Sequence, residues 1–217
     1  MNDRICFYTV CPEGRPVRLS EATRRFAWDS LHGIYGDEAM AHFTVSLEEI
    51  TDPDVLSARE GFEMYDRAVE RIAAEAPLRI CPAERICGAA TLGLAIGAIL
   101  PVKFSHADAP WGINHMSADF APAVREGMDA WEARLDRRMR RAEGETLTNR
   151  QREFLVSMKR TVGAFRLWHK RYLEATEHTR PDLHAMLTQV PFGPARGFHE
   201  AVQSLWFCFA FTRLTGN

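Results

Sequence analysis

The sequence predicts a mainly α-helical protein, and three observations lead to this fold class. Two stretches, over residues 120–139 and 155–172, repeat large apolar side chains at every third or fourth position, which is the spacing of one helix face. Both stretches begin with residues that favour a helix start. Alternation of apolar and polar residues, the pattern of a half-buried strand, is weak and limited to residues 4–10.

The first predicted helix follows Thr51-Asp52-Pro53 and is stopped by Pro77. It carries large apolar side chains at helical spacing: Phe62, Tyr65, Val69 and Ile72. Residues 1–50 show no comparable pattern, so we treat them as a poorly defined N-terminal segment.

Two long helices are expected next. The first has Asp119 as its N-cap and Pro122 in its first turn, and Gly144 ends it. The second begins at a capping box made by Thr148 and Gln151. One face of this second helix is predicted to be buried: Leu155, Met158, Val162, Phe165, Trp168 and Tyr172.

A last predicted helix, over residues 198–211, is apolar almost all the way round. Such a helix needs protein on every side, yet only three residues follow Leu214 in this sequence. We therefore expect the helix to belong to a larger core, which would make this chain the N-terminal portion of a longer fold.

The composition is that of a soluble globular protein, with 46% hydrophobic and 26% charged residues. The formal net charge of -2 gives no reason to expect nucleic acid or an anionic membrane as a partner. The uncharged stretch over residues 88–102 is shorter than the roughly 20 residues of a typical membrane span. No signal-peptide pattern is found, so we expect a cytoplasmic location.

No metal site is predicted. The spacing of the five cysteines fits no zinc template, and reduced, buried or semi-buried thiols are expected: Cys6, Cys11, Cys81, Cys87 and Cys208. None of the eight histidines follows a glutamate by three residues, which argues against a di-metal helical bundle. His169, His178 and His184 are interpreted as histidines of the surface or of helix ends.

One loop, residues 111–115 (WGINH), combines an aromatic ring, a glycine and two polar side chains just before a helix. Loops of this kind often carry binding groups, although a purely structural role for these residues stays open. The glycines at 88, 93 and 97 lack the lysine and the spacing of a phosphate-binding loop, so close packing is expected there.

Three blocks of the sequence resemble glycyl radical enzymes of the pyruvate formate-lyase family. Residues 77–88 (PLRICPAERICG) are similar to the family segment P-x-R-I-x-x-x-E-R-I-x-G. Residues 114–120 (NHMSADF) resemble H-x-x-x-D-Y, and residues 197–207 (GFHEAVQSLWF) resemble F-x-E-A-L-Q-S-x-W-F. The blocks occur in the family's order, and the resemblance covers residues 77–217.

The resemblance implies a ten-stranded α/β barrel wrapped by helices. In the family a glycyl radical, installed by a radical S-adenosylmethionine activating enzyme, passes to a cysteine inside the barrel. The thiyl radical then breaks a C–C, C–N or C–O bond of a small substrate. Residues 51–217 would form the N-terminal helical part of this fold, truncated at its C-terminal end, with the barrel itself mostly absent.

The chain departs from the family at both radical-bearing positions. It has no R-V-x-G-Y motif for the glycine and no G-C-x-E motif for the cysteine. Its one Cys-x-Glu, Cys11-Pro12-Glu13, lies far N-terminal of the family position. We therefore assign no catalytic residue and no bound cofactor, and we expect no activity from the chain alone.

The resemblance implies some substrate-contacting residues. The histidine of the second block, His115, would hydrogen bond to polar groups of the substrate. Thr215, Gly216 and Asn217 follow the apolar helix and would border the pocket. Other residues of the blocks are expected to be structural, as ion pairs (Arg79, Glu84, Arg85) or in packing (Gln203, Trp206).

Two functions remain open from the sequence. The chain is either the N-terminal part of a glycyl radical enzyme or a non-catalytic helical partner, or split subunit, of a larger radical enzyme. The expected partners are a small substrate in the complete enzyme, the activating enzyme, and a second half or another copy of the chain. The sequence does not identify the substrate.

Overall fold

The computed structural model describes residues 21, 24, 25, 60–76, 78, 80, 84–88 and 118–215. Our expectations for the loop at 111–115, for Arg79 and for the cysteines at 6, 11 and 81 lie outside these residues. Within the described part of the chain there are helices and no strands, which confirms the prediction of a mainly helical chain.

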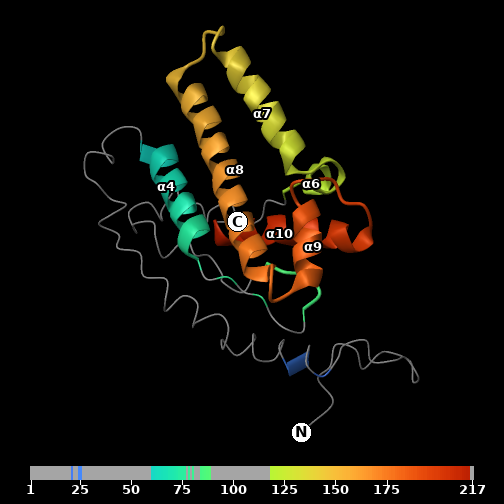
Figure 1. Ribbon diagram of the computed structural model, residues 1–217. Helices are drawn as coiled ribbons and strands as arrows, with labels where there is room; N and C mark the ends of the chain where they lie inside the picture. The colour runs from blue at the N-terminus through green and yellow to red at the C-terminus, as the bar shows by residue number, and fades with distance from the viewer. Residues whose placement is uncertain are drawn as a thin grey trace, which may run out of the picture.

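The helices pack around one long central element (Figure 1). They are α4 (Glu60–Glu75), α6 (Ala121–Glu126), α7 (Met128–Ala142), α8 (Asn149–Thr176), α9 (Pro181–Gln189) and α10 (Phe198–Leu214). α4 and α7 contact α8 from different sides, while α9 and α10 lie against its C-terminal half. None of the described helices combines the length and the apolar character that crossing a bilayer requires.

The helix predicted from Asp119 to Gly144 is interrupted at Gly127, so the prediction of one continuous helix is wrong. Gly127 has a φ of 81°, which favours glycine. A Cβ atom at this position would lie 2.2 Å from the main-chain oxygen of Phe192. The close approach lets the amides of Met128 and Asp129 donate to the carbonyls of Pro191 and Phe192, at 2.9 and 3.0 Å, so the chain before α10 caps α7.

Of the two predicted helix starts, the one at Thr148 is confirmed, whereas the prediction of Asp119 as an N-cap is wrong. The Thr148 hydroxyl accepts from the amide of Gln151, and the Gln151 side chain accepts from the amide of Thr148, which completes the capping box. Phe120 occupies the N-cap position of α6, but the Asp119 carboxylate still accepts from the Ala121 amide at 3.0 Å.

An aromatic core joins α8 to α10. Trp168 and Tyr172 of α8 and Phe207 of α10 are completely buried. The Phe207 ring lies 4.3 Å from Trp168 and 5.2 Å from Tyr172, measured between ring centroids. Phe165 extends the cluster to Phe211 at 5.0 Å. Rings in such tilted and edge-on contacts bury large areas and dominate core energetics.

Candidate functional site

The candidate site is the place where residues 84–88 meet α10, which we call the α10 junction. Gln203 of α10 is completely buried there. Its side-chain nitrogen donates to the main-chain oxygen of Cys87, and its side-chain oxygen accepts from the Cys87 amide, both at 2.8 Å. One amide side chain thus satisfies both main-chain polar groups of a buried residue 116 positions away.

A second bond holds the same segment. Nε2 of His199 donates to the main-chain oxygen of Arg85 at 2.7 Å, because a carbonyl can only accept. Gly88 has a φ of 98°, and a Cβ atom there would meet the Phe207 ring at 3.0 Å. Residues 85–88 of the first sequence block and residues 199–207 of the third therefore lie in contact.

Thr215, an expected substrate-contacting residue, lies at the C-terminal end of α10. Its hydroxyl donates to the main-chain oxygen of Phe211 at 2.9 Å, and its own main-chain oxygen accepts from the Tyr65 hydroxyl at 3.0 Å. Burial raises the pKa of Tyr65, which keeps the phenol protonated as a donor. The other three expected residues, His115, Gly216 and Asn217, lie outside the described residues.

Arg180 supports the junction from the start of α9. Its guanidinium donates to the main-chain oxygen of Glu84 at 2.7 Å and to both carboxylate oxygens of Asp182, at 3.0 and 2.8 Å. The Arg180 hydrogen bonds lower the pKa of Asp182 to about 2. Arg180 therefore holds residues 84–88 against α9 through a main-chain oxygen. The sequence analysis predicted side-chain ion pairs for this block and did not predict this contact.

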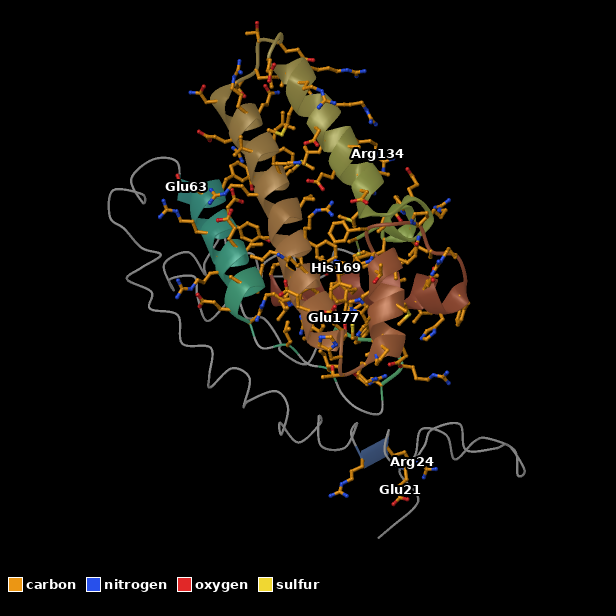
Figure 2. All side chains as sticks on the ribbon, in the orientation of Figure 1. Glu21, Arg24, Glu63, Arg134, His169 and Glu177 are labelled. Atoms are coloured by element: carbon orange, nitrogen blue, oxygen red, sulfur yellow. The ribbon has the colours of Figure 1, made fainter. Side chains whose placement is uncertain are left out.

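His169 corrects a prediction. It was interpreted as a surface or helix-end histidine, but only 6% of it is exposed, and Figure 2 shows it in the interior, where α8 passes α9. Its Nε2 donates to the main-chain oxygen of Leu187 at 2.9 Å. Burial lowers its pKa, which favours the neutral imidazole. His178 is exposed, as predicted. His184 is half-buried in the first turns of α9, where its Nδ1 lies 3.0 Å from the main-chain oxygen of Leu173 near the end of α8.

The two described cysteines, Cys87 and Cys208, are buried and reduced, as predicted for them. Burial raises the pKa of Cys87 and raises that of Cys208 to about 12. Because the thiolate is the reactive form of cysteine, neither side chain is an activated nucleophile.

A polar network between α4 and α8 was missed by the sequence analysis. Only 2% of Asp66 is exposed, and its carboxylate accepts from the Ser157 hydroxyl at 2.5 Å. Arg160 lies 3.7 Å from the same carboxylate and makes a bidentate salt bridge to Glu70, with both nitrogen–oxygen distances 2.8 Å. Loss of hydration raises the pKa of Asp66. The sequence did carry a signal for the burial of Asp66, because this residue lies at helical spacing from Phe62 and Val69 on the predicted buried face.

Two hollows mark the described surface. A shallow one of about 460 Å³ lies at the start of α10 beside Arg196, His199 and Glu200. A second, of about 210 Å³, lies among α6, α7, α8 and α10 and is lined mostly by apolar side chains, including Trp131 and Phe211. The second is also lined by Asp119 and by Cys208, whose raised pKa keeps the thiol protonated. No group of three metal-ligating side chains exists among the described residues. The described part of the chain is a helical scaffold.

The comparisons with known proteins agree with this scaffold. The sequence model of the family described as "Pyruvate formate lyase-like" matches residues 103–217, which is more than half of the chain. The chain therefore belongs to the pyruvate formate lyase-like family, as the three blocks predicted. A search of curated protein sequences finds no match.

Two solved structures share the fold. One comes from a study of 1,2-propanediol dehydration in Roseburia inulinivorans, with a TM-score of 0.60 and 16% identity. The other is a B12-independent glycerol dehydratase from Clostridium butyricum, with a TM-score of 0.53 and 13% identity. The matches cover 93% and 79% of this chain but only 33% and 32% of those chains. This chain therefore spans about a third of the length of the solved structures it matches.

Proposed function

We propose that this chain is the N-terminal helical portion of a glycyl radical enzyme and that catalysis requires further polypeptide. The family match over residues 103–217 carries the proposal. The need for further polypeptide follows from the sequence, which lacks both the radical glycine motif and the thiyl cysteine motif. The glycine and cysteine would be supplied by the remaining two thirds of such a fold.

In this proposal the chain contributes architecture. Residues 51–217 form the helical part that precedes the barrel, and residues 1–50 are a separate N-terminal segment. The Gln203–Cys87 hydrogen bonds, at 2.8 Å, hold α10 in a fixed relation to residues 84–88. A rigid α10 would position Thr215, Gly216 and Asn217 where the barrel begins. The location proposed is cytoplasmic, and the enzyme would be activated by a radical S-adenosylmethionine protein.

The proposed reaction is radical dehydration, the breaking of a C–O bond, of a small hydroxylated substrate. Support comes from the two structural neighbours, one from a study of 1,2-propanediol dehydration and the other a glycerol dehydratase. His115 is the candidate to hydrogen bond to a substrate hydroxyl. The Thr215 hydroxyl already donates to Phe211, so toward a substrate hydroxyl it would act as an acceptor.

The test is electron paramagnetic resonance of the protein purified from its source without oxygen. After treatment with S-adenosylmethionine and the activating enzyme, we expect the doublet signal of a glycyl radical from an assembly larger than this chain. We expect no doublet from the isolated 24.6 kDa chain. A source protein of 24.6 kDa that gives no radical would overturn the proposal, and a radical on the isolated chain would overturn its dependence on further polypeptide.

A further inference from the structure

The side of α7 that points away from α8 is a continuous basic surface. At 3.6 residues per turn, five arginines fall within about 160° of the helix circumference, and we call them the α7 arginine face: Arg134, Arg137, Arg138, Arg140 and Arg141. All five are exposed, whereas Leu135, on the other side of the helix, is buried. Figure 2 shows nitrogen-tipped side chains on the outer side of α7.

The acidic residues of α7 lie outside this arc and are bound by cations of α8. Lys159 pairs with Glu132 and Asp136, at 2.7 Å from each. Arg166 pairs with Asp129 and with Glu132. These three are the only acidic residues in α7. The helix thus separates its charges, with its carboxylates bound to α8 and its arginines directed outward, and its own acids do not neutralise the arginine face.

Acidic residues from outside α7 neutralise two of the five arginines. Glu126 lies 2.6 Å from Arg134, and Glu145 lies 2.9 Å from Arg138. Within the part of the chain that the structure describes, the side chains of the other three have neither an ion pair nor a hydrogen bond: Arg137, Arg140 and Arg141.

These three arginines repel one another. Arg137 lies three residues before Arg140 and four before Arg141, spacings at which like charges destabilise a helix. The negative end of the helix dipole stabilises cations in the last turn, where Arg140 and Arg141 lie, but this does not account for Arg137. An acidic partner would remove the repulsion.

We propose that the α7 arginine face is a docking surface for an acidic helix of a separate protein. The face extends over about 10 Å, the rise of seven residues, and a helix with carboxylates at every third or fourth position presents them over the same length. Guanidinium groups bind carboxylates through two parallel hydrogen bonds. Complementary charges of this kind steer association and fix the orientation of a partner. The proposal is independent of the proposed function.

Two other anionic partners fit this face less well. Nucleic acids and anionic membranes are extended polyanions, and the chain outside the arginine face repels them. Residues 134–141 hold five arginines and one aspartate, while the whole chain has a formal net charge of -2, so the remainder is net acidic. A helix that lies on a membrane also needs a free apolar face, and α7 packs against α8 on its other side.

The experiment is fluorescence anisotropy with the protein at the size that its source makes. The probe is a fluorescein-labelled, alanine-based helical peptide of about 15 residues, with glutamates at every third or fourth position along one side. A control peptide has the same composition, with its glutamates distributed around the helix. A labelled RNA of equal charge and phosphatidylglycerol vesicles are titrated under the same conditions.

Two variants remove the same charge at different places. The test variant carries three substitutions in the arginine face: Arg137→Gln, Arg140→Gln and Arg141→Gln. The matched control variant carries three at exposed arginines elsewhere: Arg24→Gln, Arg25→Gln and Arg85→Gln. Circular dichroism and a thermal melt of each variant show that the helices still form.

We expect the one-sided peptide to bind about threefold more tightly than the control peptide. Its Kd should rise about tenfold in the test variant and less than about twofold in the control variant. Binding should weaken as NaCl is raised from about 20 to about 200 mM.

Three results would overturn the proposal: equal affinity for the two peptides, equal losses in the two variants, or tighter binding of the RNA or the vesicles than of the one-sided peptide. If the test variant does not fold, Arg137→Gln alone decides, because it leaves the arginines of the last turn in place. Its Kd for the one-sided peptide should rise about threefold, and an unchanged Kd would also overturn the proposal.

Discussion

The α7–α8 hairpin and the α8–α10 core differ in how they hold two helices together. Between α7 and α8 the contacts are ionic: Lys159 lies 2.7 Å from both Glu132 and Asp136, and Arg166 contacts Asp129 and Glu132. Figure 2 shows the same charged character on the outer side of α7, at Arg134. Between α8 and α10 the contacts are aromatic rings without charges.

The difference indicates which part of the chain can face water. Ion pairs between exposed side chains contribute roughly 0–1 kcal/mol each, since water competes for both partners. The hairpin therefore gains little stability from its charges but stays soluble. Burial of large rings stabilises far more, so the core carries most of the free energy. α10 is apolar on both faces, so both faces need to be shielded from water, whereas the charged outer side of the hairpin does not.

The largest expected effect is the loss of a core ring. We expect Phe207→Ala to lower the free energy of unfolding by about 3–5 kcal/mol, because Phe207 is completely buried and its removal leaves a cavity beside Trp168. Urea titration followed by circular dichroism measures the change. The control is Phe198→Ala in the same helix, where 86% of the side chain is exposed. Equal losses in the two variants would contradict the assignment of buried and exposed faces of α10.

The next effect is the loss of the amide clamp. We expect Gln203→Met to cost about 2–4 kcal/mol, because it leaves both the N–H and the C=O of buried Cys87 without their partner. Hydrogen exchange at the Cys87 amide should accelerate at the same time. Gln151→Met is the control, since its bond to Thr148 is exposed and its loss should cost about 1 kcal/mol or less. An unchanged Cys87 exchange rate would rule out the clamp.

The pH dependence of stability should have opposite signs for the acidic groups on the two sides of α8, Asp66 and Glu132. The folded pKa of Asp66 is raised above the ordinary 3.8, so its contribution to stability falls as pH rises from 3.8 through the folded pKa. The folded pKa of Glu132 is lowered below 4.5 by hydrogen bonds from Lys159 and Arg166. Its contribution is therefore present above pH 4.5 and is lost as pH falls through the folded pKa.

Two variants measure these contributions in urea titrations between pH 3 and 7. Relative to the unsubstituted chain, Asp66→Asn should remove a loss of stability that develops with rising pH. Glu132→Gln should remove a loss that develops with falling pH. Identical changes in the pH profile of the two variants would show that burial does not distinguish the α4–α8 network from the α7–α8 ion pairs.

The smallest effect is expected at the hairpin surface. Lys159→Met removes the contacts to Glu132 and Asp136 and should cost less than about 1 kcal/mol at low salt. The cost should shrink further in about 1 M NaCl, where charges are screened beyond a few ångströms. Denaturation at the two salt concentrations measures both values. A loss as large as that of Phe207→Ala would break the comparison between hairpin and core.

Much of the helical pattern could be predicted because its causes are local. Apolar spacing located α4 and α8, and the Thr148 capping box fixed the start of α8 to the residue. The break at Gly127 could not be predicted in this way, because it depends on the Phe192 carbonyl 65 positions further along the chain. The burial of His169 depends similarly on α9, where the main-chain oxygen of Leu187 accepts a hydrogen bond from the imidazole.

The same distinction between local and long-range causes applies to the candidate site. The sequence by itself determined the family, through three short blocks, and the two-faced apolar character of α10, because residue order alone sets which side chains share a helix face. Only the tertiary structure decided that two of those blocks meet, that Gln203 holds Cys87, and that Asp66 is enclosed between α4 and α8. These contacts join residues about 90 to 116 positions apart, and pairing over such separations depends on how helices pack rather than on local sequence.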